Sequence, residues 1–131
     1  MLEQLHAGQR RFVRLLPALL SLNHKSLPGY VGGDAAGGIQ GYVHGPEIQA
    51  ELLTRFDADI KPAHRMLRQD VLNVSLMGSI ASIGHGVDSD IDVWVIHRPD
   101  LPASGRQSLQ RRLAGIERWS ASLGVRTQCF L

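Results

Sequence analysis

The fold is decided by residues 71–96, which read VLNVSLMGSIASIGHGVDSDIDVWVI. This stretch contains two apolar runs, 71–77 and 91–96, with the small, glycine-containing segment 80–88 between them. Short apolar runs bounded by turn residues are typical of buried β-strands. We therefore expect two neighbouring strands joined by a turn or by a single turn of helix.

The residues after these strands predict a helix over 105–123 and a third strand over 125–131. Ser104 is a candidate N-cap for the helix, and Gly124 marks its end. Apolar residues recur at helical spacing along its inner face: Leu109, Leu113, Ile116, Trp119 and Leu123.

The residues before the strands predict helices and one long loop. A helix is expected over 2–22, although Pro17 lies inside it and should kink it or divide it in two. The stretch 25–46 contains seven glycines and two prolines, which indicates an irregular loop. Another helix is expected after Pro46, because proline suits the first helical position, and a further helical segment over 62–69.

These elements together predict an α+β fold. Its core is a small three-stranded mixed sheet packed against helices and preceded by N-terminal helices. We expect residues 1–131 to form a single domain. Its helical N-terminal part with the glycine-rich loop covers 1–70, and the core that carries the motif covers 71–131.

Two carboxylates in the second strand are the strongest candidates for chemistry. Side chains alternate along a strand, so Asp90 and Asp92 should project from one face. Two carboxylates this close repel each other unless a cation lies between them. Mg²⁺ prefers oxygen ligands and keeps substrate phosphates in its shell, and a pair of such ions can assist phosphoryl transfer. The pair therefore predicts a metal site.

Small residues at the end of the first strand are candidates for phosphate binding. Gly78 lets the backbone approach a phosphate closely, and Ser79 offers a hydroxyl and an N–H group. If a helical turn follows, its N-terminus adds donors, and Ser82 adds another hydroxyl. An Asp-x-Asp pair alone is usually a solvated strand face. The order of strand, Gly-Ser, about ten residues and Asp-x-Asp within a second strand is more specific, and it favours the functional interpretation.

At these residues the sequence resembles the DNA polymerase β-like nucleotidyltransferase superfamily. It resembles more narrowly the N-terminal catalytic region of class I adenylate cyclases of the enterobacterial type. The similar segments span most of the chain and include Leu15-Leu16-Pro17, Pro28-Gly29-Tyr30, Met77-Gly78-Ser79, Ser89-Asp90, Trp94-Val95 and Ala121-Ser122-Leu123-Gly124-Val125.

This resemblance implies that the three-stranded sheet and its helices form a core of the nucleotidyltransferase type. It also implies conversion of ATP to 3′,5′-cyclic AMP and pyrophosphate, with two Mg²⁺ ions as cofactor. Asp90 and Asp92 would then bind the metal and act in catalysis, whereas Gly78, Ser79 and Ser82 would bind phosphate. Superfamily members usually carry a third carboxylate on the following strand, and 125–131 contains none. Class I cyclases are also several times longer. We therefore expect a fragment, inactive by itself, whose parent is the cyclase.

Composition limits the other possibilities. The net charge of +2 is too small to indicate a nucleic-acid partner, and no apolar run is long enough to span a membrane. A single cysteine, Cys129, fits a cytoplasmic protein. The expected partners are ATP and the rest of the parent chain, and exposed strand edges predict self-association. Another nucleotidyltransferase and a noncatalytic nucleotide-binding module remain alternative functions.

The sequence also predicts where two tryptophans, the glycine-rich loop and the arginines of the last helix lie. Trp94 and Trp119 should pack the last helix onto the sheet as core residues rather than contact adenine. The loop over 28–45 is either a lid that contacts nucleotide or a structural cover for the core. The arginines of the last helix are expected to be mostly solvated: Arg106, Arg111, Arg112 and Arg118.

Overall fold

The sheet has three strands, and the computed structural model describes it together with the rest of residues 6–78 and 89–131. Strand β1 covers Val71–Gly78, β2 covers Ser89–His97, and β3 covers Val125–Phe130. Their order is β1-β2-β3, so β2 is the central strand. β1 and β2 are antiparallel, whereas β2 and β3 are parallel. The predicted strands and the mixed sheet are confirmed.

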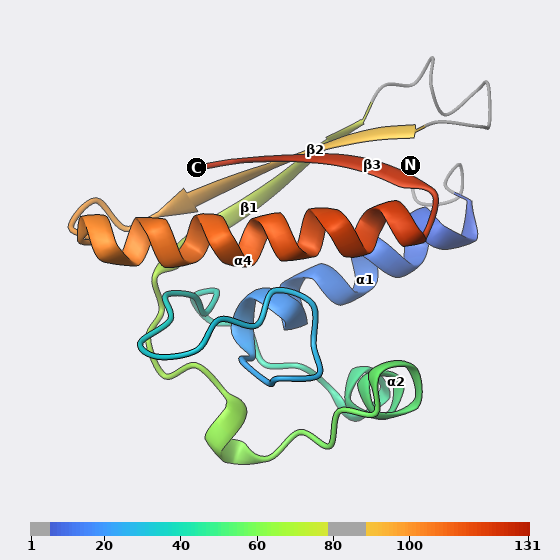
Figure 1. Ribbon diagram of the computed structural model, residues 1–131, viewed down its shortest axis with the longest axis horizontal. Coiled ribbons are helices and arrows are strands. Elements are labelled where there is room, and N and C mark those ends of the chain that lie inside the picture. Colours follow the sequence, from blue (N-terminus) through green and yellow to red (C-terminus); the bar gives the residue numbers. More distant parts are fainter. Residues whose placement is uncertain (1–5, 79–88) are drawn as a thin grey trace.

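Helix α4, Ala103–Ser122, connects β2 to β3 and lies beneath the sheet (Figure 1). A parallel pair needs such a crossover, and the apolar face of the helix supplies one side of the core. The helix begins after Pro102, whose side chain makes no capping hydrogen bond. The expected N-cap at Ser104 is therefore wrong. Gly124, with φ of 75°, follows the end of the helix as predicted.

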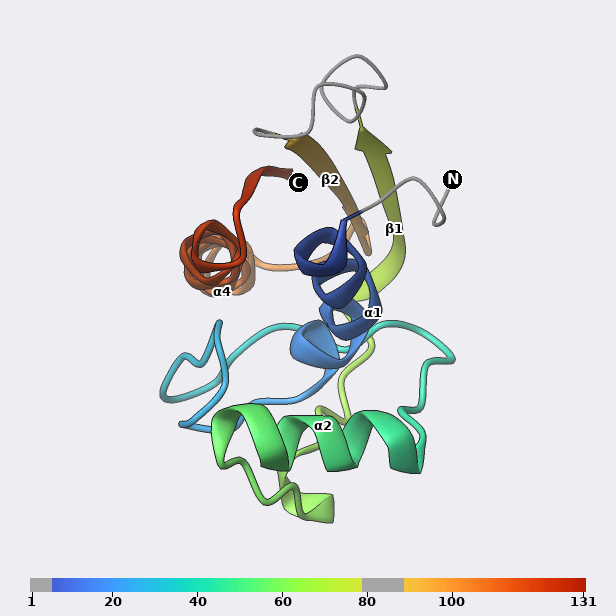
Figure 2. The same cartoon turned by 90° about the vertical axis from the view of Figure 1, so that its right-hand side faces the viewer.

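Helix α1, Ala7–Ser21, lies beside α4 on the same side of the sheet (Figures 1 and 2). His6 and Gln9 form a capping box at its start. The helix continues through Pro17, so the expected division does not occur. Buried residues on both sides of the proline explain this, because their burial outweighs the loss of one hydrogen bond. They are Phe12, Leu15, Leu16, Ala18, Leu19 and Leu20.

Helix α2, Pro46–Phe56, lies on the far side of α1 and α4 from the sheet (Figure 2). Its Glu51 accepts hydrogen bonds from Arg14 of α1 at 2.8 Å and from Arg55 at 2.7 Å. Burial alone would raise the pKa of Glu51, but these two hydrogen bonds outweigh it and hold the pKa below its ordinary value. The ion pairs thus connect α2 to α1 at the surface.

The helical segment expected over 62–69 is wrong in its second half. Only a short 3-10 helix, η2 (Pro62–His64), forms there. The chain after it is extended, because Met66 N–H donates to the Ser21 carbonyl at 3.1 Å and Arg65 bridges to Leu22. Backbone pairing with the end of α1 therefore replaces helical hydrogen bonds.

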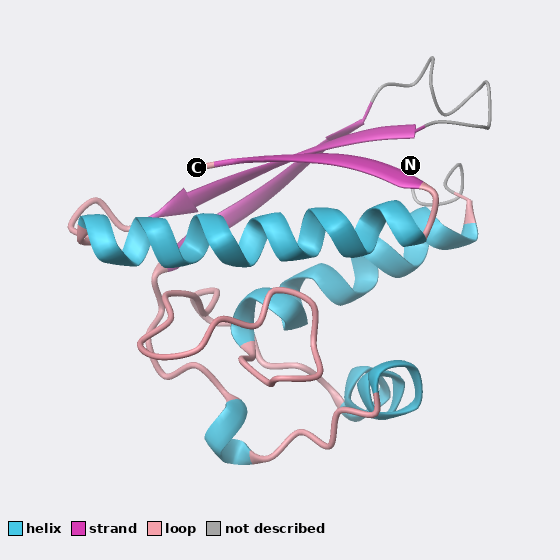
Figure 3. Ribbon diagram, in the orientation of Figure 1, coloured by secondary structure: helices cyan, strands magenta, loops and turns pink. Residues whose placement is uncertain are grey.

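The glycine-rich stretch 25–45 contains no helix or strand, as predicted, and its loops gather below the helices (Figure 3). Gly38, with φ of 87°, holds it against the core. Its N–H donates to the Leu20 carbonyl at 2.7 Å, and its own carbonyl accepts from Val71 N–H at 3.0 Å. The loop is thereby fixed between the end of α1 and the start of β1.

One apolar core fills the space between the sheet and the helices, which confirms the α+β fold. Its members come from α1, α2, α4, all three strands and the loops, and include Phe12, Leu16, Leu19, Leu52, Val71, Val93, Val95, Leu109, Ile116 and Val125. None of the helices in the described parts of the chain has the length and apolarity needed to cross a membrane.

Candidate functional site

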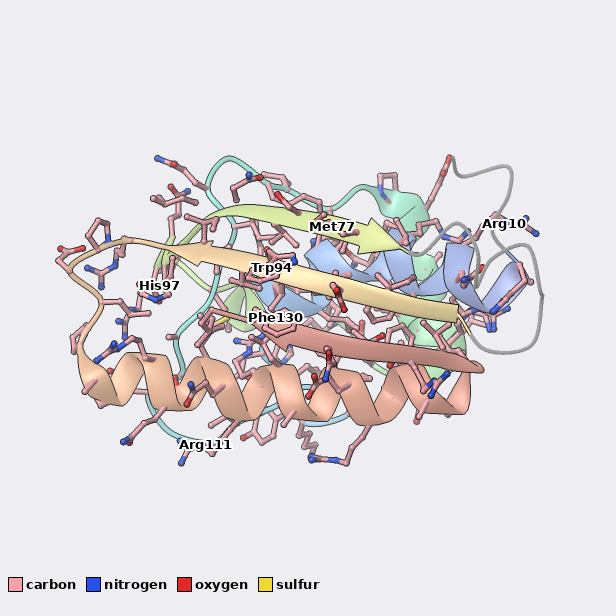
Figure 4. The ribbon with its side chains drawn as sticks, turned by 90° about the horizontal axis from the view of Figure 1, so that it is seen from above. Arg10, Met77, Trp94, His97, Arg111 and Phe130 are labelled. Carbon is pink, nitrogen blue, oxygen red and sulfur yellow. The ribbon has the colours of Figure 1, made fainter. Side chains whose placement is uncertain are left out.

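The sheet has one covered face and one open face. Ile91, Val93 and Val95 point toward the helices and are at most 4% exposed. The residues that alternate with them lie on the opposite face, where Trp94 and Ile96 remain 41% and 49% exposed. Asp92 belongs to this second set and is half-buried. We call this second side, which no described element covers, the open face (Figure 4).

The strand register brings the motif residues to one end of the sheet. Gly78 is the last residue of β1 and pairs with Ile91, next to Asp92 in β2. Asp90 lies in the same strand, two positions before Asp92. Ser79 and Ser82 lie outside the described residues.

The neighbours of the carboxylate positions are known from the same register. Met77 of β1 and Gln128 of β3 lie on either side of Asp92. Arg126 of β3 lies opposite Asp90. In the strand register, an arginine and a glutamine of β3 are thus the partners of the two aspartate positions.

The donor chemistry of this pair fits Mg²⁺. Two aspartates on alternate residues of a strand offer hard oxygen ligands from one face. Mg²⁺ is commonly bound through one or two carboxylates, with waters and substrate phosphates completing its shell. No group of three metal-binding side chains occurs within the described ranges 6–78 and 89–131. Asp90 and Asp92 could therefore hold the ion only with help from substrate or from further residues.

Trp94 is not a core residue, contrary to expectation. It lies on the open face and stacks on Phe130 of β3, with ring centroids 4.3 Å apart and ring planes inclined by 17°. Alternation from Asp92 already implied this face, since the two residues are two positions apart. Trp119 is different and packs against Phe12 and Phe56 beneath the sheet, as predicted.

Arg112 is also misplaced by the sequence prediction, because it is fully buried rather than solvated. Its guanidinium donates to the carbonyls of Leu19 at 2.6 Å, Leu22 at 2.7 Å and Ala36 at 3.3 Å, and it contacts Met66 Sδ. Burial lowers its pKa to about 10, so it stays charged at neutral pH. It satisfies carbonyl groups at the C-terminal end of α1, where a cation is favourable.

Asp70 is a second buried polar group that the sequence did not reveal. Its carboxylate accepts from Arg98 Nε at 2.8 Å and from Gly37 N–H at 3.0 Å, and it pairs with Arg68 at 3.2 Å. These contacts fix the start of β1, the end of β2 and the glycine-rich loop to one another. The sequence contains little indication of this ion pair, because Asp70 and Arg98 are recognisable only as the residues that flank the two strands.

The glycine-rich loop lies on the far side of α1 and α4 from the open face (Figure 1). A hollow of about 380 Å³ lies against it, lined in part by Tyr42, His44, Arg65 and Met66. Its contacts are with the core and with the end of α1, not with Asp92. The structure therefore favours the structural cover over the nucleotide lid.

Cys129 of β3 lies at the edge of the sheet. Its N–H donates to Glu117 Oε2 of α4 at 2.9 Å, so a side chain occupies a donor that the edge strand would otherwise expose. Burial and then the charge of Glu117 raise the pKa of the thiol to about 12. The thiol is therefore protonated and weakly reactive at neutral pH.

Comparison with known proteins identifies the family. The family model described as "Adenylate cyclase NT domain" matches residues 1–131, and the chain belongs to this family. The adenylate cyclases of Salmonella typhimurium and Escherichia coli K12 are each 37% identical to it over 124 residues. That of Pasteurella multocida is 36% identical over 124 residues. No solved structure gives a significant match.

The matched region is a small part of these relatives. It covers 89% of this chain and 14% of the Salmonella and Escherichia cyclases, and 90% of this chain and 15% of the Pasteurella cyclase. The resemblance to the N-terminal region of enterobacterial adenylate cyclases is thereby confirmed.

Proposed function

We propose that this chain is the N-terminal, metal-binding part of an enzyme that converts ATP to 3′,5′-cyclic AMP and pyrophosphate. The observation that carries this proposal is Asp92 on the open face of the central strand, at the same end of the sheet as Gly78. The adenylate cyclases to which the chain is similar support the choice of reaction.

Each motif residue has a role in this proposal. Asp90 and Asp92 hold Mg²⁺, which supplies positive charge to offset the charge that develops on the phosphates. Gly78 and Ser79, with Ser82, hold the β- and γ-phosphates through N–H and hydroxyl donors. The site thereby orients the ribose 3′-hydroxyl toward the α-phosphorus, opposite the pyrophosphate leaving group. We propose on the same grounds that the core is of the nucleotidyltransferase type.

We propose further that residues 1–131 are inactive by themselves. Proton removal from the 3′-hydroxyl and full ligation of the metal call for a third carboxylate near Asp92. The strand beside it, β3, contains no Asp or Glu, and Gln128 occupies the position opposite Asp92. We infer that this third carboxylate comes from another part of the parent chain.

Two other functions remain to be separated from this one. Another nucleotidyltransferase would use the same carboxylates but transfer the nucleotide to a second molecule. A noncatalytic nucleotide-binding module would bind ATP without changing it.

Product analysis distinguishes the cyclase from these alternatives. The full-length parent is incubated with Mg²⁺ and each nucleoside triphosphate in turn, and the 131-residue chain is incubated in parallel. We expect the parent to form cyclic AMP and pyrophosphate from ATP and the isolated chain to form neither. Robust turnover by the isolated chain would disprove its inactivity, and an intact triphosphate after incubation with the parent would favour the binding module.

A further inference from the structure

The stacked pair of Trp94 and Phe130 is the most exposed aromatic surface on the open face of the described chain. Trp94 lies two positions beyond Asp92 on the same strand, which is a distance of about 7 Å. Phe130 lies directly opposite Trp94 on β3. Neither ring is needed to fill the core, which lies on the other side of the sheet.

The geometry of the pair leaves one face of the indole available. The 4.3 Å between the ring centroids is close to the spacing of neighbouring strands, about 4.8 Å, so the rings stand side by side across β2 and β3. The second face of Trp94 is consequently turned toward β1. The residue of β1 in register with Trp94 is Ser75, which is small and exposed.

The surroundings of Ser75 suit a flat heterocycle. Asn73 and Met77 lie on either side of it along β1, and both are exposed on the same face. A planar ring over Ser75 would stack on Trp94, contact the polarisable thioether of Met77, and have the Ser75 hydroxyl and the Asn73 amide within reach as hydrogen-bonding groups. Figure 4 shows Met77, Trp94 and Phe130 together on this face.

The order of groups along the sheet matches the order of groups in a nucleotide. Gly78 and Asp92 lie toward one end, and Trp94 and Ser75 follow toward the other. A nucleoside triphosphate with its phosphates at Gly78 and its ribose beside Asp92 places its base at Trp94. The separation of about 7 Å between the two β2 positions is one that a ribose can bridge.

We propose that Trp94, supported by Phe130, is the stacking platform for the purine base, and that the base occupies the surface over Ser75. This inference rests on the proposed function, since it assumes that the carboxylates receive a nucleoside triphosphate. It adds a base-binding element to a motif that reads only metal and phosphate. Phe130 acts as a positioning residue, because it holds the indole upright.

Paired ligands with and without a base test this proposal on the full-length parent. The first ligand is α,β-methylene-ATP, in which the bond to the leaving group cannot be broken, and the second is inorganic tripolyphosphate. Binding of each is measured by calorimetry with Mg²⁺. Replacement of Trp94 by alanine should weaken α,β-methylene-ATP by roughly 5- to 150-fold and leave tripolyphosphate within about twofold.

Further variants separate loss of stacking from loss of fold. Trp94→Phe retains an aromatic face and should restore most of the lost affinity. Ser75→Leu fills the base position while Trp94 itself is retained, and should also weaken only the nucleotide. Leu53→Ala removes a side chain of similar exposure, 48%, from α2 on the far side of the molecule, and should change neither affinity.

The possible failures are distinguishable. Equal weakening of both ligands by Trp94→Ala, or no weakening of either, would overturn the base platform and favour a surface that other parts of the parent cover. Such a result leaves the proposed function intact if the wild-type parent still forms cyclic AMP. Conversely, selective weakening in a parent that forms no cyclic AMP would support the platform and contradict the proposed reaction.

Discussion

Replacement of Arg112 by methionine should destabilise the fold strongly, although the residue is far from the candidate site. Methionine has a similar length but no donors, so the carbonyls of Leu19, Leu22 and Ala36 lose the partners that hold them at 2.6, 2.7 and 3.3 Å. A buried carbonyl without a partner costs about 1–3 kcal/mol, which gives a gross loss of about 6 kcal/mol for three.

Part of this loss is offset because a buried charge disappears. The pKa of Arg112 is lowered from 12.5 to about 10, which corresponds to about 3 kcal/mol of burial cost. The net destabilisation is therefore about 3 kcal/mol. For a chain of this length it corresponds to a fall of about 10 °C in melting temperature.

Thermal unfolding of the two matched variants Arg112→Met and Arg111→Met, followed by circular dichroism, tests this reasoning. Arg111 is the preceding residue of α4 but is exposed, and its side chain points away from the core (Figure 4). Its replacement should cost less than about 0.5 kcal/mol. Equal melting temperatures for the two variants would refute the view that Arg112 holds α1, α4 and the loop together.

Three other predictions concern the remaining parts of the fold. Gly38→Ala should prevent stable folding, because its Cβ would lie 1.9 Å from the backbone oxygen of Arg68. Gly41 also has a positive φ, 78°, but its Cβ would enter open space, so Gly41→Ala should lower the free energy of unfolding by only about 1–2 kcal/mol. Chemical denaturation of the two variants measures this difference. Glu51→Gln should cost less than about 1 kcal/mol at pH 7, because its arginine partners are 49% and 37% exposed. Since the pKa of Glu51 is lowered by folding, this difference should vanish as the pH falls through that lowered value, and persistence in acid would contradict the ion pairs. Cys129 should react slowly with iodoacetamide at pH 7 and rapidly after unfolding, and fast alkylation of the native chain would contradict its raised pKa.

Local patterns in the sequence predict the sheet and the last helix well. The apolar runs and their glycine boundaries place all three strands, because a strand covered on one side shows its pattern over a few residues. The segment 62–69 fails for the opposite reason. Its backbone pairs with Ser21 and Leu22, which are distant in sequence, and no local pattern records such a contact.

The two misplaced side chains show where chemical type overrode periodicity. Arg112 is three residues after Leu109 and four before Ile116, so helical spacing alone puts it on the buried face. Trp94 shares the alternation of Asp92 and so belongs to the open face. Arginine is usually solvated and tryptophan is usually buried, and this general preference gave the wrong location for both side chains although the spacing gave the right one. Helical spacing does not show which carbonyl groups will accept hydrogen bonds from the buried guanidinium and so offset the cost of its burial.

The positions of Asp90, Asp92 and Gly78 along the strands follow from sequence, but their surroundings do not. Arg126 and Gln128 become neighbours of the carboxylates only through the parallel pairing of β2 and β3, which depends on the crossover through α4. The site therefore combines a local motif with a contact that spans the whole αβ unit.

The most direct test of the central claim is the rate of cyclic AMP formation by the full-length parent carrying Asp92→Asn. Asparagine keeps the size of the side chain and removes the charge that we propose binds Mg²⁺, so we expect the rate to fall by about 10²- to 10³-fold. Asp59→Asn, at an exposed position beyond α2, is the matched control and should retain full activity. If Asp92→Asn forms cyclic AMP at the rate of the wild-type parent, then the open face of the sheet is not the catalytic metal site.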